Sequence, residues 1–441
     1  MHFPTLIRTR REHVRNARKT RDEIRALQLH KFRALVRHAQ AHSPYYRQII
    51  DERRIDPANA TPADFPVLTK ADFLQNFDAI VTDRSVTKAA IHEFLRDSHD
   101  ERARFRGKYY VVHSSGTSGT AGFQIYSGKD WARGAAHAFR INPPSVGRRR
   151  MAFFAKSHGH PIGLGFANST QTWPLSLLYK LAVFDIGDPV AGVVKGLNEF
   201  RPTILMGYPS ALALLAHQQR FGDLRVRPRW IQGSGEAATA VQRAAIQEAF
   251  GVPYINVYSC TEHAIMGFAR PDTDGMYLLE DDLIFESNPD HVLVTNLFNY
   301  TAPLIRYRMS DLLVPKEDTV NLFPFTKVTE VVGRGELVAF LKNRHGADDI
   351  LLPSQTTELF EVNVTNFQLH MTTRSSCILR VVLRPGLDAD TAAASMRRIE
   401  ASLRATLDRK EMTNVQLSVA PVAELPRDPS GKLRTVINAP A

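Results

Sequence analysis

The spacing of hydrophobic positions changes along the chain, and each spacing predicts a different kind of structure. In residues 1–54 the apolar side chains, among them Ile24, Leu27, Phe32 and Leu35, recur about once per helical turn, which predicts amphipathic helices. From about residue 109 onward, short apolar runs alternate with helical segments. Strands that alternate with helices need crossover connections, so this part predicts a mostly parallel sheet with helices on both faces.

The expected elements of this α/β region follow one another closely. Strands are expected at Tyr109–His113, Met151–Ala155, Ala182–Ile186, Thr203–Gly207, Trp230–Gly233 and Tyr254–Tyr258, and helices at Asp130–Arg140, Pro189–Phe200, Pro209–Arg220 and Ala237–Phe250. Gly251 and Pro253 mark the end of the last of these helices, because glycine accepts a left-handed backbone and proline cannot continue a helix.

Two further changes of pattern divide the rest of the chain. Residues 276–314 contain strand-like runs without helices, which predicts a β-rich subdomain. After residue 335 the pattern becomes that of an α+β module with a helix at Ala389–Leu407. We therefore predict an α/β fold with a large N-terminal domain (1–334), which has mostly parallel sheets flanked by helices plus the β-rich subdomain, and a small mobile α+β C-terminal lid domain (335–441).

Composition narrows the class of protein. A content of 44% hydrophobic and 23% charged residues in 441 residues is typical of a soluble globular protein with more than one domain. No apolar stretch approaches the roughly 20 residues that a membrane span needs, and the N-terminus lacks the apolar centre of a secretory signal. Only Cys260 and Cys377 are present, too few for a disulfide framework, so we expect a cytoplasmic protein.

The net charge of +11 is concentrated in residues 1–54. Such a segment is either a solvated amphipathic helix packed on the body or a contact for a phosphate-rich partner. The aromatic residues that stack nucleic-acid bases are not interleaved with its basic residues. The sequence therefore predicts no nucleic-acid partner.

A loop rich in glycine and hydroxyl residues follows the strand at 109–113. Glycine allows positive backbone torsions, so successive N–H groups can turn toward one anion, and the hydroxyl groups add donors. A flexible linker is the alternative, but a linker rarely lies between a β-branched strand and a helix. We interpret the loop as a phosphate site formed by Ser114, Ser115, Gly116, Thr117, Ser118, Gly119 and Thr120. It is not a P-loop, because no lysine follows its glycines.

Seven further short motifs accompany this loop in a fixed order, one of them before it and six after it. They are Gly207-Tyr208-Pro209-Ser210, Gly233-Ser234-Gly235-Glu236, Asn256-Val257-Tyr258-Ser259-Cys260-Thr261-Glu262, Arg306-Tyr307-Arg308-Met309-Ser310-Asp311, Gly333-Arg334-Gly335-Glu336 and Pro429-Ser430-Gly431-Lys432, together with the helical segment at 27–47. With the phosphate loop, they resemble the adenylate-forming (acyl-CoA synthetase-like) superfamily and, within it, the phenylacetate–CoA ligase and capsule-biosynthesis-type branch. The resemblance covers nearly the whole chain.

The resemblance implies three catalytic residues. Glu262 would hold a Mg²⁺ ion that bridges phosphates, since a hard cation prefers carboxylate oxygens. Thr261 would contact the α-phosphate. Lys432 would contact the carboxylate of the acid and the α-phosphate, and so reduce the repulsion between two anions. Asp311 would bind both ribose hydroxyls, with Arg334 beside it.

The same resemblance implies the surroundings of the base and the acid. Asn256, Gly235 and Glu236 would border the adenine, and Tyr258 would stack on it. Ser259 replaces a glycine common in relatives, so its hydroxymethyl group would shorten the acyl pocket or contact the substrate carboxylate. Apolar and aromatic residues are the expected pocket walls, which favours an aryl or hydrophobic acid: Phe153, Phe154, Tyr208, Ile231 and Tyr258.

Function and partners follow as expectations. The implied reaction converts a carboxylic acid and MgATP to acyl-AMP and then transfers the acyl group to the thiol of CoA, with rotation about Gly335–Glu336 between the steps. Transfer to a carrier protein or an amine is the alternative, and a non-catalytic basic nucleotide- or nucleic-acid-binding protein is a remote one. Relatives are often homodimers. His158-Gly159-His160 resembles a metal pair, but without a neighbouring acid cluster it is interpreted as a loop near the acyl pocket.

Overall fold

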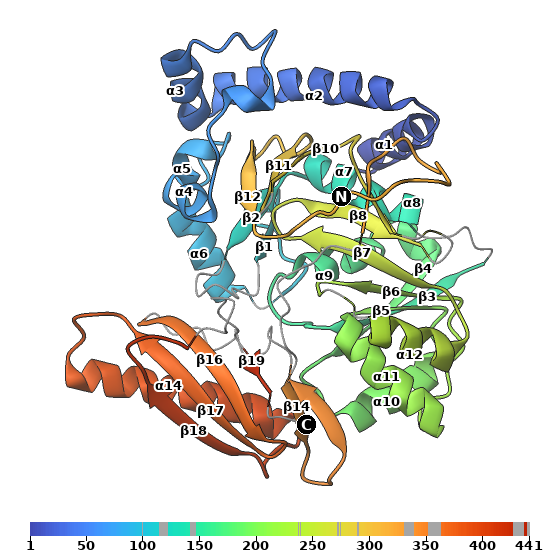
Figure 1. Ribbon diagram of the computed structural model, residues 1–441, viewed down its shortest axis with the longest axis vertical. Coiled ribbons are helices and arrows are strands. Elements are labelled where there is room, and N and C mark those ends of the chain that lie inside the picture. Colours follow the sequence, from blue (N-terminus) through green and yellow to red (C-terminus); the bar gives the residue numbers. More distant parts are fainter. Residues whose placement is uncertain are drawn as a thin grey trace.

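The main sheet lies at the centre of the molecule, with helices on both of its faces (Figure 1). The computed structural model describes residues 1–98, 100–113, 122–141, 147–236, 238, 240–270, 273, 275–288, 291–329, 339–351, 363–426 and 436–438. Five sheets are formed by these residues, and the largest has eight strands. The α/β class predicted from the sequence is confirmed.

The eight strands lie in the order β13-β9-β8-β7-β6-β5-β3-β4. Five of them, β4, β3, β5, β6 and β7, run parallel, as predicted. Their bounds are β3 Arg149–Ala155, β4 Tyr179–Asp185, β5 Ile204–Gly207, β6 Trp230–Ser234 and β7 Tyr254–Cys260, followed by β8 Ala264–Ala269, β9 Met276–Leu278 and β13 Lys327–Val328. Because ligands bind at the carboxyl ends of such strands, this edge of the sheet is where a site is expected.

Helices cover both faces of the sheet. One face carries α10 (Val190–Phe200), α11 (Pro209–Phe221) and α12 (Ala240–Phe250), and the other carries α7 (Gly128–Ala136), α8 (Ala138–Ile141) and α9 (Ile162–Ser169). The helix α12 ends where the sequence predicts, since Gly251 follows it with a left-handed φ of 64°. The short helix η2 spans Leu175–Leu177.

The basic N-terminal segment is helical and packs on the body (Figure 1). It forms α1 (Phe3–Asn16), α2 (Arg21–His42) and α3 (Pro44–Arg53), and α4 (Lys70–Gln75), α5 (Phe77–Ile80) and α6 (Lys88–Asp97) follow after η1 (Pro62–Asp64). The Thr20 hydroxyl group caps α2 by accepting a hydrogen bond from the backbone N–H of Glu23, and the Glu23 carboxylate accepts one from the backbone N–H of Thr20. This reciprocal cap fixes where the long second helix begins.

The β-rich part consists of β10 (Leu283–Ser287), β11 (Val292–Asn296) and β12 (Tyr307–Met309), which form one antiparallel sheet. Beyond it, the C-terminal part has a core of its own that includes Leu369, Leu379 and Leu403. Its elements are β14 (Ala339–Lys342), β15 (Asp348–Leu351), β16 (Val364–Thr373), β17 (Ser376–Leu383), α14 (Ala389–Arg409), β18 (Gln416–Pro421) and β19 (Val436–Ile437). The predicted boundary at 334/335 lies outside the described residues.

A buried lysine of the C-terminal part contacts the main domain. Lys410 Nζ donates a 2.9 Å hydrogen bond to the carbonyl oxygen of Ile186, in the loop after β4, and lies 3.2 Å from Asp349 Oδ1. Two parts with separate cores are thus joined by a polar contact beside the main sheet.

Two details differ from the sequence-based expectations. The strand β1 (Tyr110–His113) pairs only with β2 (Phe123–Tyr126), in an antiparallel hairpin apart from the main sheet. The segment after the glycine-rich loop is therefore a strand. The helix expected at Asp130–Arg140 follows this strand as two shorter helices, α7 from Gly128 and α8 from Ala138. In addition, β8 returns antiparallel beside β7, a connection that the apolar pattern alone did not distinguish from a parallel one.

Candidate functional site

Two turns at the carboxyl ends of β5 and β6 are fixed to each other. Glu236 Oε2 accepts hydrogen bonds from the backbone N–H (3.3 Å) and the hydroxyl group (2.6 Å) of Ser210. Gly235 has a φ of 84°, and a Cβ atom there would lie 2.8 Å from the ring of Tyr208. Only glycine fits this turn without a shift of its neighbour. Gly235 and Glu236, which the sequence predicts at the adenine, thus belong to a turn that is held in place by the neighbouring turn at 208–210.

At the end of β7, Tyr258 contacts Asp311, which comes from the segment after β12. The Tyr258 hydroxyl group donates a 2.7 Å hydrogen bond to Asp311 Oδ2. Burial raises the pKa of Tyr258 well above its usual value, and the charge of Asp311 raises it further. The phenol therefore stays protonated and acts as a donor to the carboxylate. The residues predicted at the adenine and at the ribose are neighbours in the fold.

The next residues of this segment are held by two tyrosines. Tyr126 Oη donates to the carbonyl oxygens of Thr261 (2.8 Å) and Glu262 (3.0 Å), and Tyr307 Oη lies 3.5 Å from Glu262 Oε1. Burial and the charge of Glu262 raise the pKa of Tyr307. Within the described parts of the chain, this long contact is the only side-chain hydrogen bond of the Glu262 carboxylate. Its oxygens suit a hard cation such as Mg²⁺.

A mainly apolar cavity of about 100 Å³ opens beside these turns. One wall is the sheet face that carries Phe153, Met206 and Ile265, and the other comes from α7–α9 and includes Phe139 and Phe166. Ser234 and Ser259 also line it. Ser234 directly precedes Gly235, and Ser259 directly follows Tyr258. The cavity therefore meets the candidate nucleotide residues at the carboxyl ends of β6 and β7.

The predicted pocket walls are only partly brought together. Phe153 lines the cavity, whereas Tyr208 and Tyr258 are not among its lining residues. Ile231 packs in the core between the sheet and α10–α12, as does Phe154. Along β6 successive side chains face opposite sides, so Gln232, and not Ile231, reaches the cavity. Side chains two positions apart in a strand share a face, so Gln232 lies on the same face as Ser234. This alternation is the sequence signal that could have identified Gln232.

Asn256 faces the side of the sheet opposite the cavity. There it lines a polar hollow of about 400 Å³ together with Arg243, Tyr254, Arg270 and Lys316. Burial raises the pKa of Tyr254, whose hydroxyl oxygen is buried without a hydrogen-bond partner. The structure thus separates the predicted adenine neighbour Asn256 from the acyl cavity by the thickness of the sheet.

Several predicted residues lie outside the described part of the chain. They are the phosphate-loop residues Ser114, Ser115, Gly116, Thr117, Ser118, Gly119 and Thr120, the hinge-side Arg334 and the catalytic candidate Lys432. Their roles stay predictions from the sequence. The strand β1, which ends at His113, leads the chain into the loop.

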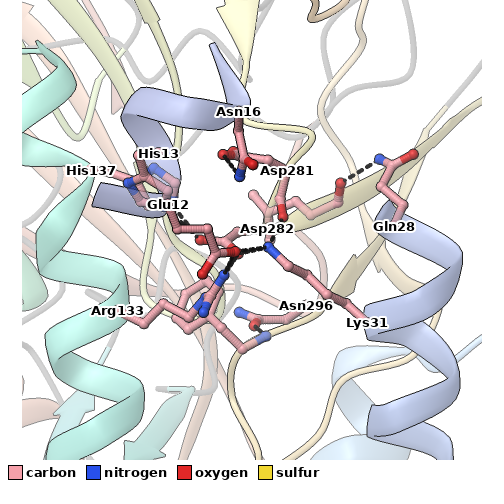
Figure 2. A network of polar contacts seen from close by, with 12 residues as sticks. Glu12, His13, Asn16, Gln28, Lys31, Arg133, His137, Asp281, Asp282 and Asn296 are labelled. Carbon is pink, nitrogen blue, oxygen red and sulfur yellow. Dashed lines mark hydrogen bonds and ion pairs between the residues drawn. The ribbon is translucent and has the colours of Figure 1, made fainter. Parts of the chain in front are cut away.

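A buried polar network connects the N-terminal helices to the turn before β10 (Figure 2). Asp282 accepts from His13 (2.9 Å), Lys31 (3.0 Å) and Arg133 (2.7 Å). Asp281 accepts from Asn16 and Arg140. These cations hold the pKa of both aspartates well below the usual range. The basic segment is therefore anchored by charge to the body.

Three members of this network, His13, His137 and Asp281, each have a possible metal-ligand atom within 4.8 Å of the others. The Asp281 carboxylate is already held by the Arg140 guanidinium through two hydrogen bonds of 3.0 and 2.8 Å. The two imidazole rings stack with their centroids 4.2 Å apart. Because its one carboxylate is already held by an arginine, we interpret this set as a structural ion-pair cluster and do not assign a metal to it.

The pair His158 and His160 does not form a metal centre with the described residues. His160 Nε2 lies 3.1 Å from Ser98 Oγ, and the His160 backbone N–H donates to His113. His158 lies 3.8 Å from Asp185. The histidines point to different partners, which agrees with a loop rather than a metal site.

Comparison with known proteins identifies relatives over most of the chain. No family model matches. A phenylacetate-coenzyme A ligase of Aromatoleum evansii is 25% identical over 77% of this chain and 76% of its own length. Protein CapK of Staphylococcus aureus is 23% identical over 97% of this chain and 92% of its own.

The fold has also been seen in solved structures. A 2-hydroxyisobutyryl-CoA ligase in complex with 2-HIB-AMP and CoA in the thioesterification state aligns with a TM-score of 0.65 at 18% identity, over 96% of this chain and 91% of that chain. At this identity the likeness supports the fold. No helix in the described residues is both long and apolar enough to span a membrane.

Proposed function

We propose that this chain, a phenylacetate–CoA ligase-like protein of the adenylate-forming superfamily, is an AMP-forming acid–thiol ligase. It activates a carboxylic acid with ATP to an acyl-AMP and transfers the acyl group to the thiol of CoA. One observation carries the proposal. An apolar cavity opens where Ser234 and Ser259 lead into the Gly235-Glu236 turn and the Thr261-Glu262 segment, so an acid and a nucleotide can meet there.

The nucleotide is held by the polar rim of the site. Asp311, oriented by the Tyr258 hydroxyl group, accepts from the ribose hydroxyls, and the sequence assigns Arg334 to the same sugar. Asn256, Gly235 and Glu236 border the adenine. From the sequence, we assign the β- and γ-phosphates to the loop at 114–120, whose residues offer backbone N–H groups and hydroxyls as donors.

Thr261, Glu262 and Lys432 are the residues that we assign to the phosphate groups and to the carboxylate of the acid. Mg²⁺, when bound at the Glu262 carboxylate, neutralises phosphate charge. Thr261 contacts the α-phosphate, and Lys432 holds the acid carboxylate against it. Both Thr261 and Glu262 are fixed in place through their carbonyl oxygens by Tyr126, so these groups need little rearrangement when the reaction begins.

The acid is aryl or hydrophobic. The lining of the cavity is dominated by side chains such as Phe139, Phe153, Phe166 and Met206. Sites of this kind select a ligand by apolar contact and orient it by a few polar groups. The separate C-terminal part carries Lys432, and rotation near Gly335–Glu336 withdraws this lysine before CoA enters.

The direct experiment is acid-dependent pyrophosphate release from ATP with a panel of aryl and aliphatic acids, followed by mass spectrometry of the products with CoA. We expect release with one class of acid and a CoA thioester as product. Glu262→Gln is the control, since loss of the carboxylate charge should lower release at least a hundredfold. Absence of release with every acid contradicts the proposal, and Tyr46→Phe serves as a folded variant altered away from the site.

The acyl acceptor is a separate question. A carrier protein or an amine is the second candidate acceptor, and this candidate rests on the resemblance read from the sequence motifs. If pyrophosphate is released but no CoA thioester forms, hydroxylamine trapping of acyl-AMP and incubation with a carrier protein distinguish the two.

A further inference from the structure

The floor of the acyl cavity contains one buried amide. Gln232 lies in β6 with Met206 of β5 directly beside it, and Phe153 of β3 lies beside Met206. These three side chains line the cavity from neighbouring strands. Gln232 is only 7% exposed, and its Oε1 atom has no hydrogen-bond partner among the residues that the structure describes.

The other polar side chains of the deep cavity are satisfied by the protein. Ser169 Oγ accepts from Trp131 Nε1 (2.8 Å) and donates to the carbonyl oxygen of Gly165 (2.9 Å). Thr170 Oγ1 donates to the carbonyl oxygen of Ala167 at 2.6 Å. Among the described residues that line the cavity, Gln232 alone has a buried side-chain polar atom without a partner. Such an atom is costly to bury, which points to a partner supplied by the ligand.

The position of Gln232 tells which end of the ligand it meets. Ser234 lies two residues further toward the carboxyl end of β6, where the reacting carboxylate is placed by the proposed function. At about 3.3 Å per residue, Gln232 lies about 6–7 Å deeper. This is the span of an aromatic ring, so the amide faces the end of the acid remote from its carboxylate.

We infer that Gln232 selects a hydroxy-substituted apolar acid, with the hydroxyl group at the end remote from the carboxylate. The inference rests on the proposed function and adds the class of substrate to it. A hydroxyl group both donates and accepts, so it satisfies the amide whichever way the amide is turned. The cavity volume of about 100 Å³ is of the order of the roughly 150 Å³ apolar cavity that holds a benzene ring in another protein.

The experiment compares acids in matched pairs on the wild-type enzyme. Phenylacetate is paired with 4-hydroxyphenylacetate, and benzoate with 4-hydroxybenzoate, and kcat/KM for pyrophosphate release is measured for each. We expect the hydroxylated acid of at least one pair to be preferred about tenfold or more, because an apolar analogue leaves the buried amide without a partner. A wild-type enzyme that uses the unsubstituted acids equally well or better overturns the inference.

Variants then assign the preference to one residue. Gln232→Leu gives a side chain of similar size without polar atoms. The ratio of kcat/KM for the hydroxylated acid to that for the unsubstituted acid should therefore fall to about 1. Met206→Leu, in the same floor, should change both acids of a pair by the same factor and leave their ratio unaltered. An unchanged ratio in Gln232→Leu overturns the assignment. If no acid supports pyrophosphate release, the proposed function itself has failed, which is a different result from release without hydroxyl preference.

Discussion

The hydroxyl group of Tyr258 lies 2.7 Å from the carboxylate of Asp311, although 53 residues separate them in the sequence. Tyr258 ends the parallel part of the main sheet, and Asp311 follows the β-rich part. The hydrogen bond therefore fixes the relative position of two segments that the nucleotide would contact together. It also orients a carboxylate whose proposed task is to accept two ribose hydroxyls.

Tyr258→Phe is expected to raise the KM for ATP about tenfold, with a smaller effect on kcat. A hydrogen bond to a charged group contributes about 1.5–3 kcal/mol, and its loss removes one of the contacts that orient Asp311. Steady-state kinetics of pyrophosphate release measure both constants. Tyr46→Phe is the matched control, since among the described residues its buried hydroxyl group bonds to the backbone of Pro303 and Ile305 and not to a carboxylate. An unaltered KM for ATP in Tyr258→Phe would contradict the proposal that Tyr258 orients Asp311 toward the ribose.

Lys432→Ala is expected to separate the two half-reactions. Loss of a preorganised charge commonly costs on the order of 10²–10³ in rate, so acid-dependent ATP–pyrophosphate exchange should fall by that factor or more. Formation of the thioester from supplied acyl-AMP and CoA should continue at nearly the wild-type rate. Lys195→Ala, an exposed lysine on α10, should leave both steps unchanged. Normal exchange in Lys432→Ala argues against any role in adenylation.

Much of the fold could be predicted from local patterns. Short apolar runs identified the parallel strands, and Gly251 with Pro253 located the end of α12, because both signals depend on backbone freedom within a few residues. The antiparallel return of β8 could not be predicted in this way. A buried strand has the same apolar pattern in either direction, and only its neighbours decide which one it takes.

The site was harder to predict within strands, because a shift of one position along a strand moves a side chain to the opposite face of the sheet. Hydropathy favoured Ile231 as a pocket wall, but strand alternation places it in the opposite core and Gln232 in the cavity. The cluster around Asp282 gave no local signal at all, because its partner His13 is 269 residues away. Contacts of that kind arise from the tertiary fold.

His263 should make the protein less stable in mild acid. Its ring is fully buried beside Tyr307, and burial lowers its pKa from 6.5 to about 3. The unfolded chain binds a proton below about pH 6.5 while the folded chain excludes it. The free energy of unfolding therefore falls as the pH falls from 6.5 toward 3, by about 2 kcal/mol at pH 5 from this residue.

Urea unfolding between pH 5 and 7.5 measures this effect. In His263→Phe the ring cannot titrate, so the loss of stability on acidification should be smaller than in the wild type. His137, whose pKa is lowered to about 4 by burial, should account for part of the remaining slope. His30→Gln, at an exposed position, should keep the wild-type slope. Equal slopes in His263→Phe and the wild type contradict the assignment.

Asp282→Asn should lower the free energy of unfolding by about 3–5 kcal/mol, because removal of one partner leaves buried charges uncompensated. Lys31 and Arg133 both contact Asp282 Oδ1, so the change weakens the attachment of α2 to the body as well as that of α7. Asp22→Asn breaks an exposed pair with Arg25 and should have no measurable effect. Urea unfolding at pH 7 gives both values. Equal stability of the two variants would mean that the basic helices are held by their apolar face alone, and the charge of the N-terminal segment would then need another explanation.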